Sequence, residues 1–145
     1  MEITFSDIDH DDLVDCSELL VSIFKEPQWN EDWDVEDSFE RLSAFLSCPN
    51  TISLKAEFKG QICGFLIGEI QRWKKSNVYY LKEMCVTTSM QRQGVGKAMM
   101  AQLGGILKEK RVVQIFLITQ RDGVPSKFYA SLEFKEIPSI MVMGN

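Results

Sequence analysis

The sequence predicts a single α/β domain over residues 1–145, with a mixed, mostly antiparallel sheet and helices on both faces. The hydrophobic pattern has helical spacing in the first third of the chain, alternates as in strands over residues 51–87, and then becomes helical again. Across residues 78–118 a strand, a glycine-containing turn, a helix and an apolar run follow one another. That order is typical of a right-handed β-α-β unit, so its two strands should be parallel.

The first third of the chain is expected to form a short strand and two helices. Residues 3–5 read as the strand, and residues 9–12 offer N-cap side chains for a helix that Pro27 stops. The loop QWNEDWD leads to a second helix over residues 35–46. Pro49 and Asn50 mark its end.

The middle and the end of the chain are expected to form the sheet. Residues 51–58 and 62–73 read as a hairpin around a turn at Lys59 and Gly60, and residues 78–87 read as a third strand. Residues 112–118 are continuously apolar, which predicts a strand buried on both faces. A short helix is expected over residues 125–131, and one or two closing strands are expected within residues 134–143.

Composition limits the classes of function. The net charge of −5 argues against nucleic-acid binding, and no apolar run is long enough for a membrane span. The acidic start lacks a signal-peptide pattern, so a cytoplasmic protein is expected, and a homodimer is one assembly that the sequence allows. The four cysteines and the single histidine lack metal-ligand spacing, so no metal is expected and the thiols read as buried and reduced.

The stretch SMQRQGVGKAMM, residues 89–100, places two glycines at a helix start, where a ligand would approach the backbone closely. A Walker A loop is excluded, because one residue separates the glycines and Ala98 follows Lys97. A dinucleotide fingerprint is weak, because Met99 occupies its third glycine position. The remaining pattern is Q/R-x-x-G-x-G/A, matched by QRQGVG.

The predicted strand YYLKEMCV precedes the QRQGVG motif, and KFYASLEF follows it about thirty residues later. With these three features the chain resembles the GNAT superfamily of N-acetyltransferases. YLKEMCV and PQWNEDW resemble its aminoglycoside N-acetyltransferase-like branch. The resemblance implies a GNAT-like acyl-CoA N-acyltransferase fold and acetyl-CoA as cosubstrate. It implies that main-chain groups of Cys85 and Val86 hold the pantetheine arm, and that backbone N–H groups at the helix start bind the pyrophosphate. The pyrophosphate loop comprises Gln91, Arg92, Gln93, Gly94, Val95, Gly96 and Lys97.

The chain departs from the family pattern in three places. Glu133 replaces the glycine of F-Y-x-x-x-G-F, so that turn is expected to change shape. The family asparagine after the next strand is missing from residues 119–123, which puts the pantetheine contacts from that strand in doubt. Gly104 and Gly105 interrupt the helix, and tight packing on the sheet is one explanation.

The resemblance implies direct acetyl transfer to an amine. A protonated amine must lose a proton, and Glu83 is the candidate base on one apolar strand face with Leu81 and Cys85. Glu69, Tyr80, water, or a merely structural ion pair at Glu83 are the alternatives. Tyr129 occupies the position of the family tyrosine that protonates the thiolate; the alternative is a core tyrosine.

The acceptor site is expected in the loop between the first two helices. Trp29, Asp32 and Trp33 are candidates for binding a cationic amine through ring faces and charge, against the alternative that the tryptophans only pack the loop. A small-molecule amine and a protein amine both remain open as acceptors. Two other functions also remain: a non-catalytic acyl-CoA-binding or regulatory module, and a nucleotide-binding regulator.

Overall fold

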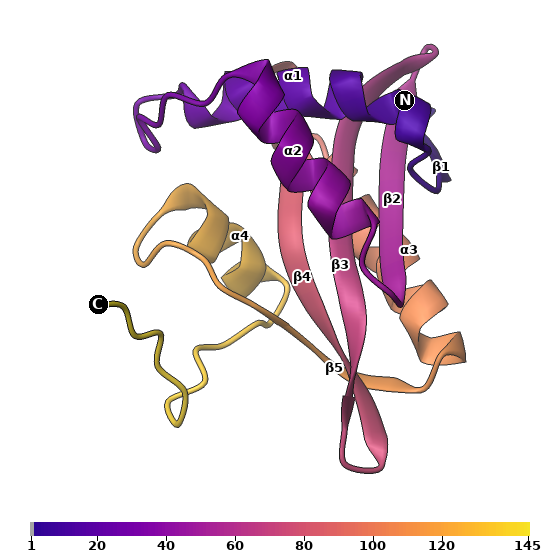
Figure 1. The fold of residues 1–145 in the computed structure, drawn as a ribbon, viewed down its shortest axis with the longest axis vertical. Helices are drawn as coiled ribbons and strands as arrows, with labels where there is room; N and C mark the ends of the chain where they lie inside the picture. Colours follow the sequence, from indigo (N-terminus) through magenta and orange to yellow (C-terminus); the bar gives the residue numbers. More distant parts are fainter. Residues whose placement is uncertain (1) are drawn as a thin grey trace.

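A five-stranded mixed sheet is the centre of this computed structural model, which describes residues 2–145. The strands lie in the order β1-β2-β3-β4-β5 (Figure 1). The first four pair antiparallel, whereas β4 and β5 are parallel, as the β-α-β pattern predicts. The bounds are Thr4–Ser6 for β1, Thr51–Phe58 for β2, Gln61–Trp73 for β3, Ser76–Val86 for β4 and Val112–Leu117 for β5.

Helices cover both faces of the sheet, which confirms the predicted layers (Figure 1). α1 (Leu13–Phe24) and α2 (Val35–Leu46) lie on one face, α3 (Val95–Glu109) lies on the other, and α4 (Val124–Ser131) follows β5. Short 3-10 turns at His10–Asp12 and Thr88–Met90 precede α1 and the turn before α3. Within residues 2–145, every helix is too short or too polar to cross a bilayer.

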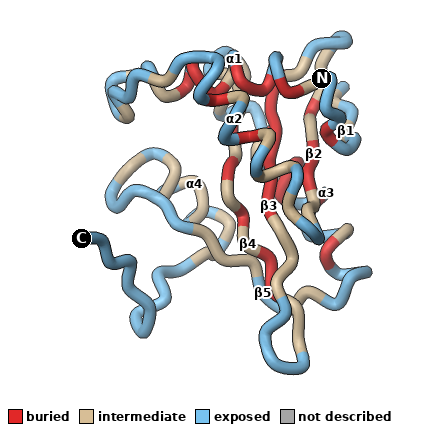
Figure 2. Tube along the Cα trace, in the orientation of Figure 1, coloured by how far each residue is buried: buried red, intermediate tan, exposed pale blue. Residues whose placement is uncertain are grey.

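Two apolar clusters, one on each face, hold these layers together. Phe65 and Ile67 of β3 point toward α1 and α2, whereas Leu66 points toward α3, and all three are fully buried. This alternation follows from the two-residue period of a strand. Figure 2 shows buried residues along the middle of β3 and the inner side of α1.

A bulge in β4 reverses which side chains face which helix. Ile67 pairs with Glu83 and the next residue, Gly68, pairs with Leu81, so Lys82 is the extra residue. As a result Leu81 packs on the α3 side, whereas Cys85 packs on the α1 and α2 side. The expectation that Leu81, Glu83 and Cys85 share one face is therefore wrong.

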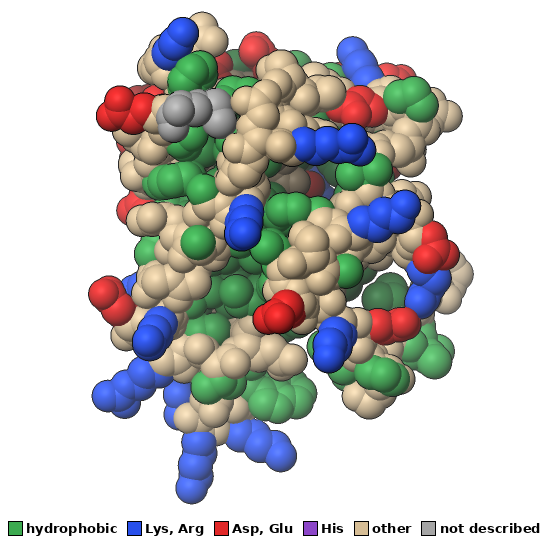
Figure 3. Space-filling view, turned by 180° about the vertical axis from the view of Figure 1, so that it is seen from behind, with side chains coloured by type: hydrophobic (Ala, Val, Ile, Leu, Met, Phe, Trp, Pro, Cys, Tyr) green, Lys and Arg blue, Asp and Glu red, His purple; other side chains and the backbone are tan. Residues whose placement is uncertain are grey.

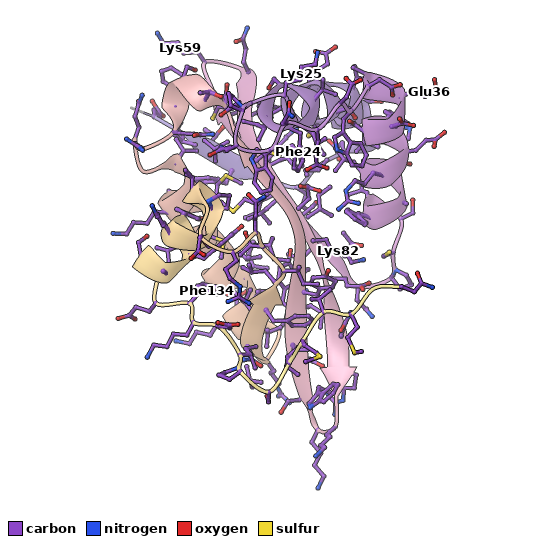
Figure 4. All side chains as sticks on the ribbon, turned by 90° about the vertical axis from the view of Figure 1, so that its left-hand side faces the viewer. Phe24, Lys25, Glu36, Lys59, Lys82 and Phe134 are labelled. Carbon is purple, nitrogen blue, oxygen red and sulfur yellow. The ribbon has the colours of Figure 1, made fainter. Side chains whose placement is uncertain are left out.

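β4 and β5 separate beyond this bulge. Their pairing ends at Leu81 and Leu117, and Figure 1 shows β5 leading away from β4 toward α4. The last residues of β4 thus have an open edge on the side where α4 stands. In Figure 4 Lys82 lies on the α2 side of the sheet and Phe134 on the side of α3 and α4.

The end of the chain differs from the sequence-based prediction. β5 is not buried on both faces: Val113 is 70% exposed, and no further strand is assigned in the described residues after it. The expected closing strands over residues 134–143 are absent, since Pro138 lacks an N–H donor and the neighbouring side chains are exposed. A two-bonded ion pair between Arg121 and Glu136 attaches this segment to the loop after β5.

The paired glycines of α3 do not pack on the sheet. Gly104 and Gly105 are both exposed, and a Cβ atom built on either would have no neighbour within 4 Å. The expectation of tight packing at these positions is wrong.

Candidate active site

The start of α3 presents unpaired backbone donors. Gly94 is the N-cap, with φ 85 and ψ 3, and its carbonyl accepts the N–H of Ala98 at 2.9 Å. The N–H groups of the first helical turn, on Val95, Gly96 and Lys97, precede that bond and have no partner inside the helix. A Cβ on Gly94 would have no neighbour within 4 Å, so Gly94 itself borders open space at this helix start. Such a helix start fits a phosphate group.

Side chains of the preceding turn fix its shape. The Gln91 amide donates to the Val86 carbonyl at 3.0 Å, and the Gln93 amide donates to the Ser89 carbonyl at 3.0 Å. Arg92 adopts a left-handed conformation, with φ 64, and is exposed. The two glutamines therefore support the loop, which leaves Arg92 and Lys97 as its exposed cations.

Gly96 is needed for packing against α4. A Cβ there would lie 3.1 Å from Cζ of Phe128 and 3.5 Å from Cε of Met84. The sequence suggested that both glycines make room for a pyrophosphate. The structure gives them different environments: Gly94 borders open space, whereas Gly96 lets α3 approach α4.

The open edge of β4 carries main-chain groups of alternate residues. Thr87 N–H donates to the Cys63 carbonyl at 2.8 Å, which makes the Val86–Gly64 pair a non-hydrogen-bonded one. The main-chain groups of Cys85 therefore point toward β3, whereas those of Met84 and Val86 point toward the open edge, where the Val86 carbonyl already accepts the Gln91 amide and the Val86 N–H remains for a ligand. This geometry favours Met84 and Val86 over Cys85 for holding an extended ligand. The Cys85 thiol is buried, and burial raises its pKa well above the ordinary value.

α4 ends in a turn that positions its tyrosine. The N–H groups of Glu133 and Phe134 donate to the carbonyls of Ala130 and Tyr129, both at 3.0 Å, which is the Schellman arrangement. Glu133 adopts the left-handed conformation that glycine favours, with φ 69. Glutamate in the place of the family glycine is thus compatible with a regular Schellman turn at the end of α4.

Tyr129 is directed at the end of β4. Its hydroxyl donates to the Met84 sulfur at 3.7 Å, and its ring packs against Phe134 at 5.8 Å between centroids. Burial raises the pKa of Tyr129, and the nearby Cys85 and Glu83 raise it further. The hydroxyl therefore stays protonated at neutral pH, as a proton donor must.

Glu83 forms a largely buried ion pair with α2. Its side chain is 9% exposed, and its Oε2 accepts Nε of Arg41 at 3.0 Å. Burial raises the pKa of Glu83, and Glu31 raises it further, while the hydrogen bond and the charge of Arg41 oppose that rise. The sequence did not single out Arg41, because nothing in the α2 pattern marks one arginine as the partner of a distant strand.

The predicted acceptor residues divide into two groups. Trp33 lies next to the ion pair, with the Arg41 guanidinium 5.6 Å from its ring centre. Trp29 packs edge-on against Phe24 at 5.1 Å, as the packing alternative predicts, and Asp32 is exposed in the loop.

The alternative bases have other partners. Glu69 pairs with Lys82 at 3.2 Å, and hydrogen bonds from Gln71 and Lys82 lower its pKa. Tyr80 stacks on Phe116 with centroids 4.8 Å apart. Of the candidates, Glu83 combines burial with a raised pKa, the environment expected of a proton acceptor.

Charge is unevenly distributed over the molecule. Figure 3 shows Lys and Arg side chains gathered at the lower end, where the turn between β3 and β4 exposes Arg72, Lys74 and Lys75. The acids of the α1–α2 loop lie at the other end (Figure 1). Some of them serve the fold, since the Asp34 carboxylate caps α2 by accepting Asp37 N–H at 2.7 Å.

This site therefore combines an anion-binding helix start, an open strand edge, a protonated tyrosine and a buried carboxylate. The tyrosine contacts Met84 on the side of α3 and α4, whereas the carboxylate contacts Arg41 on the side of α2, so the end of β4 has one proton-transferring group on each face.

Several solved structures of known proteins have a fold similar to that of this chain. Similar folds include a possible acetyltransferase from Clostridium difficile 630 (15% identity, 100% of this chain and 98% of that chain, TM-score 0.83). A ribosomal-protein-alanine N-acetyltransferase from Brucella melitensis biovar Abortus 2308 matches with 16% identity, full coverage of both chains and a TM-score of 0.81. An aminoglycoside N-acetyltransferase in complex with CoA matches with 16% identity, 99% and 95% coverage and a TM-score of 0.78.

No curated protein sequence matches the chain significantly. The model of the Acetyltransferase (GNAT) family matches residues 15–134, which is most of the chain. Together with the fold and the strand–turn–helix geometry described above, this match shows that the chain belongs to the Acetyltransferase (GNAT) family.

Proposed function

We propose that this protein transfers an acetyl group from acetyl-CoA directly to the primary amine of a cationic acceptor. The observation that carries the proposal is the start of α3, where Gly94 borders open space beside unpaired N–H donors directly after the open edge of β4. These groups fit the phosphates and the extended arm of coenzyme A. When bound, acetyl-CoA supplies the reactive thioester.

The chain's own residues supply binding and proton transfer. The N–H groups at the start of α3 bind phosphate oxygens, with Arg92 and Lys97 adding positive charge. The main-chain groups of Met84 and Val86 hold the arm at the strand edge. Glu83 accepts the proton that a cationic amine must lose, directly or through water, and Tyr129 donates a proton to the departing thiolate.

The acceptor is proposed to be cationic because Glu31, Asp32 and Glu36 are exposed around the loop that carries Trp33. Among the similar structures are aminoglycoside acetyltransferases and a ribosomal-protein-alanine N-acetyltransferase. A panel of aminoglycosides, polyamines, amino acids and peptides, scored by release of free thiol, identifies the acceptor class. For a cationic substrate KM should rise with salt, because screening weakens the attraction.

Ligand-induced thermal stabilisation tests the phosphate site. At 100 times Kd, a ligand adds about 2.7 kcal/mol to the free energy of unfolding. For a domain of this size we expect CoA and acetyl-CoA to raise Tm by about 10 °C. ATP and NAD should do much less, because neither carries the pantetheine arm. A CoA shift without thiol release from any amine would favour the acyl-CoA-binding module instead.

Gly94→Val with Gly60→Val as control makes this test specific. Both glycines have positive φ, 85 and 76, and both border open space, so the backbone strain introduced by valine is similar. Gly60 lies in the turn between β2 and β3, away from the proposed site. Gly94→Val should lose the CoA shift and Gly60→Val should keep it, each relative to its own ligand-free Tm. A full shift in Gly94→Val would refute the assignment of this loop.

A further inference from the structure

Arg41 of α2 is held against the Glu83 carboxylate by several contacts. Its Nε lies 3.0 Å from Oε2 of Glu83, and its guanidinium lies 4.7 Å from the ring centre of Phe45 and 5.6 Å from that of Trp33. The planar guanidinium suits such stacking, since it interacts with ring faces and still donates in its own plane. Two aromatic rings and one carboxylate therefore fix its position, although its side chain is 40% exposed.

The contact leaves part of the carboxylate available. Within residues 2–145, Arg41 is the side chain that donates a hydrogen bond to Glu83, and it reaches Oε2 rather than Oε1. A buried carboxylate held by one oxygen keeps its other oxygen for a second donor, such as an amine or a water molecule. The pair therefore orients Glu83 without covering it.

We propose that Arg41 is a positioning residue for acetyl transfer, which fixes the Glu83 carboxylate in its ionised form with Oε1 directed to the acceptor amine. This role rests on the proposed function. A purely structural pair would join α2 to the sheet and have no effect on the proton-accepting group.

Among the groups around Glu83, Arg41 is the one that favours the ionised carboxylate. Burial favours the neutral acid, and Glu31 from the loop before α2 adds a like charge. Cys85 on β4 and Tyr129 on α4 also lie close enough to interact, and both stay neutral at physiological pH because burial raises their pKa values. Among these groups Arg41 is the one cation, so it alone counteracts burial.

Lys82 supplies a matched control on the same face of the sheet. Its ammonium lies 5.1 Å from the centre of the Phe45 ring, much as Arg41 does, but it pairs with Glu69 at 3.2 Å. Replacing either cation by methionine keeps a long apolar stem over Phe45 and removes one charge. Arg41→Met removes the cationic partner of Glu83, whereas Lys82→Met removes that of Glu69.

The experiment measures the titration of Glu83 by carboxyl carbon NMR in the wild type, Arg41→Met, Arg41→Lys and Lys82→Met. The Glu83 signal is identified by its absence in Glu83→Gln. We expect the Glu83 pKa to rise in Arg41→Met, to change less in Arg41→Lys, and to stay unchanged in Lys82→Met. Arg41→Lys retains a charge and provides a second, milder variant if Arg41→Met does not fold.

Steady-state kinetics then connect the titration to the reaction. Below neutral pH, kcat/KM of Arg41→Met should fall about 10-fold or more, and the loss should shrink as the pH rises. An unchanged Glu83 pKa in folded Arg41→Met and Arg41→Lys would overturn the proposal. So would a shifted pKa with an unshifted pH–rate profile, because Glu83 would then not be the group that limits the rate.

Failure of the proposed function has a different signature. If the wild type transfers acetyl groups to no amine, the proposed function fails and the role of Arg41 fails with it, whatever the NMR titration shows. If the wild type is active and Arg41→Met retains the wild-type pH profile, the role of Arg41 fails alone.

Discussion

The hydroxyl of Tyr129 donates to the sulfur of Met84 at 3.7 Å, so α4 and the open end of β4 meet at this pair. A thioether is a weak acceptor, which leaves the hydroxyl proton free to move to a better base. Because the main chain of Met84 also points to the open strand edge, a thiolate leaving there would lie within reach of the tyrosine.

Tyr129→Phe should lower kcat about 10–100-fold and leave the CoA-induced Tm shift unchanged. The loss is at the low end for a general acid, because a thiolate is already a fair leaving group. The phenyl ring keeps the contact with Phe134, so folding is preserved. Stopped-flow measurement of a single turnover isolates the chemical step. An unchanged single-turnover rate would exclude Tyr129 from the mechanism.

Glu83→Gln should reduce the rate most at pH values just above the pKa of Glu83, where the carboxylate is ionised and solvent is still a poor acceptor of the amine proton. Burial raises the pKa of Glu83, and a base works only when deprotonated, so wild-type kcat/KM should fall as the pH drops through that raised value. The glutamine variant has no carboxylate to protonate, so its kcat/KM should not show this fall. The difference in rate between variant and wild type should shrink at high pH, where solvent accepts the amine proton.

Glu69→Gln is the comparison for this prediction, since Glu69 also pairs with a cation but has a lowered pKa. The pH profile of kcat/KM is the measurement. If Glu69→Gln loses the acid limb and Glu83→Gln retains it, the base is Glu69.

Glu133→Gly should stabilise the protein by about 1 kcal/mol, which is about 3–5 °C in Tm. A Cβ is disfavoured at φ 69, and glycine removes that cost, although its greater freedom in the unfolded chain offsets part of the gain. Glu133→Ala retains the Cβ and should bring no comparable gain. Thermal unfolding of the three proteins measures the difference, and equal Tm values would contradict it.

Gly104→Ala and Gly105→Ala should each stabilise the protein by about 0.5–1 kcal/mol, because alanine favours the helix and its Cβ meets no neighbour within 4 Å. Gly68→Ala is the opposite case, since its Cβ would clash with the ring of Tyr79 and the carbonyl of Tyr80. Urea unfolding at constant m-value compares the three variants. A loss of stability in both α3 variants would contradict this prediction.

Local sequence patterns predicted most of the elements, because period and capping act over a few residues. The helix at residues 35–46 and the strand at residues 51–58 have the predicted bounds. The turn at Lys59 and Gly60 follows from its glycine, and the parallel pairing of β4 with β5 follows from chain connectivity. The prediction of closing strands over residues 134–143 was wrong, because an apolar run becomes a strand only where a sheet edge pairs with it.

The sequence by itself predicted the family, the position of the glycine turn at the start of α3 and the presence of a tyrosine on α4. Each of these follows from a motif of neighbouring residues. Only the tertiary structure decided what Glu83 faces. One extra residue at Lys82 turns its side chain toward α2, and Arg41, distant in sequence, meets it there. A side chain's face depends on the pairing register, and its partner depends on how separate layers pack, so neither is written in a local pattern.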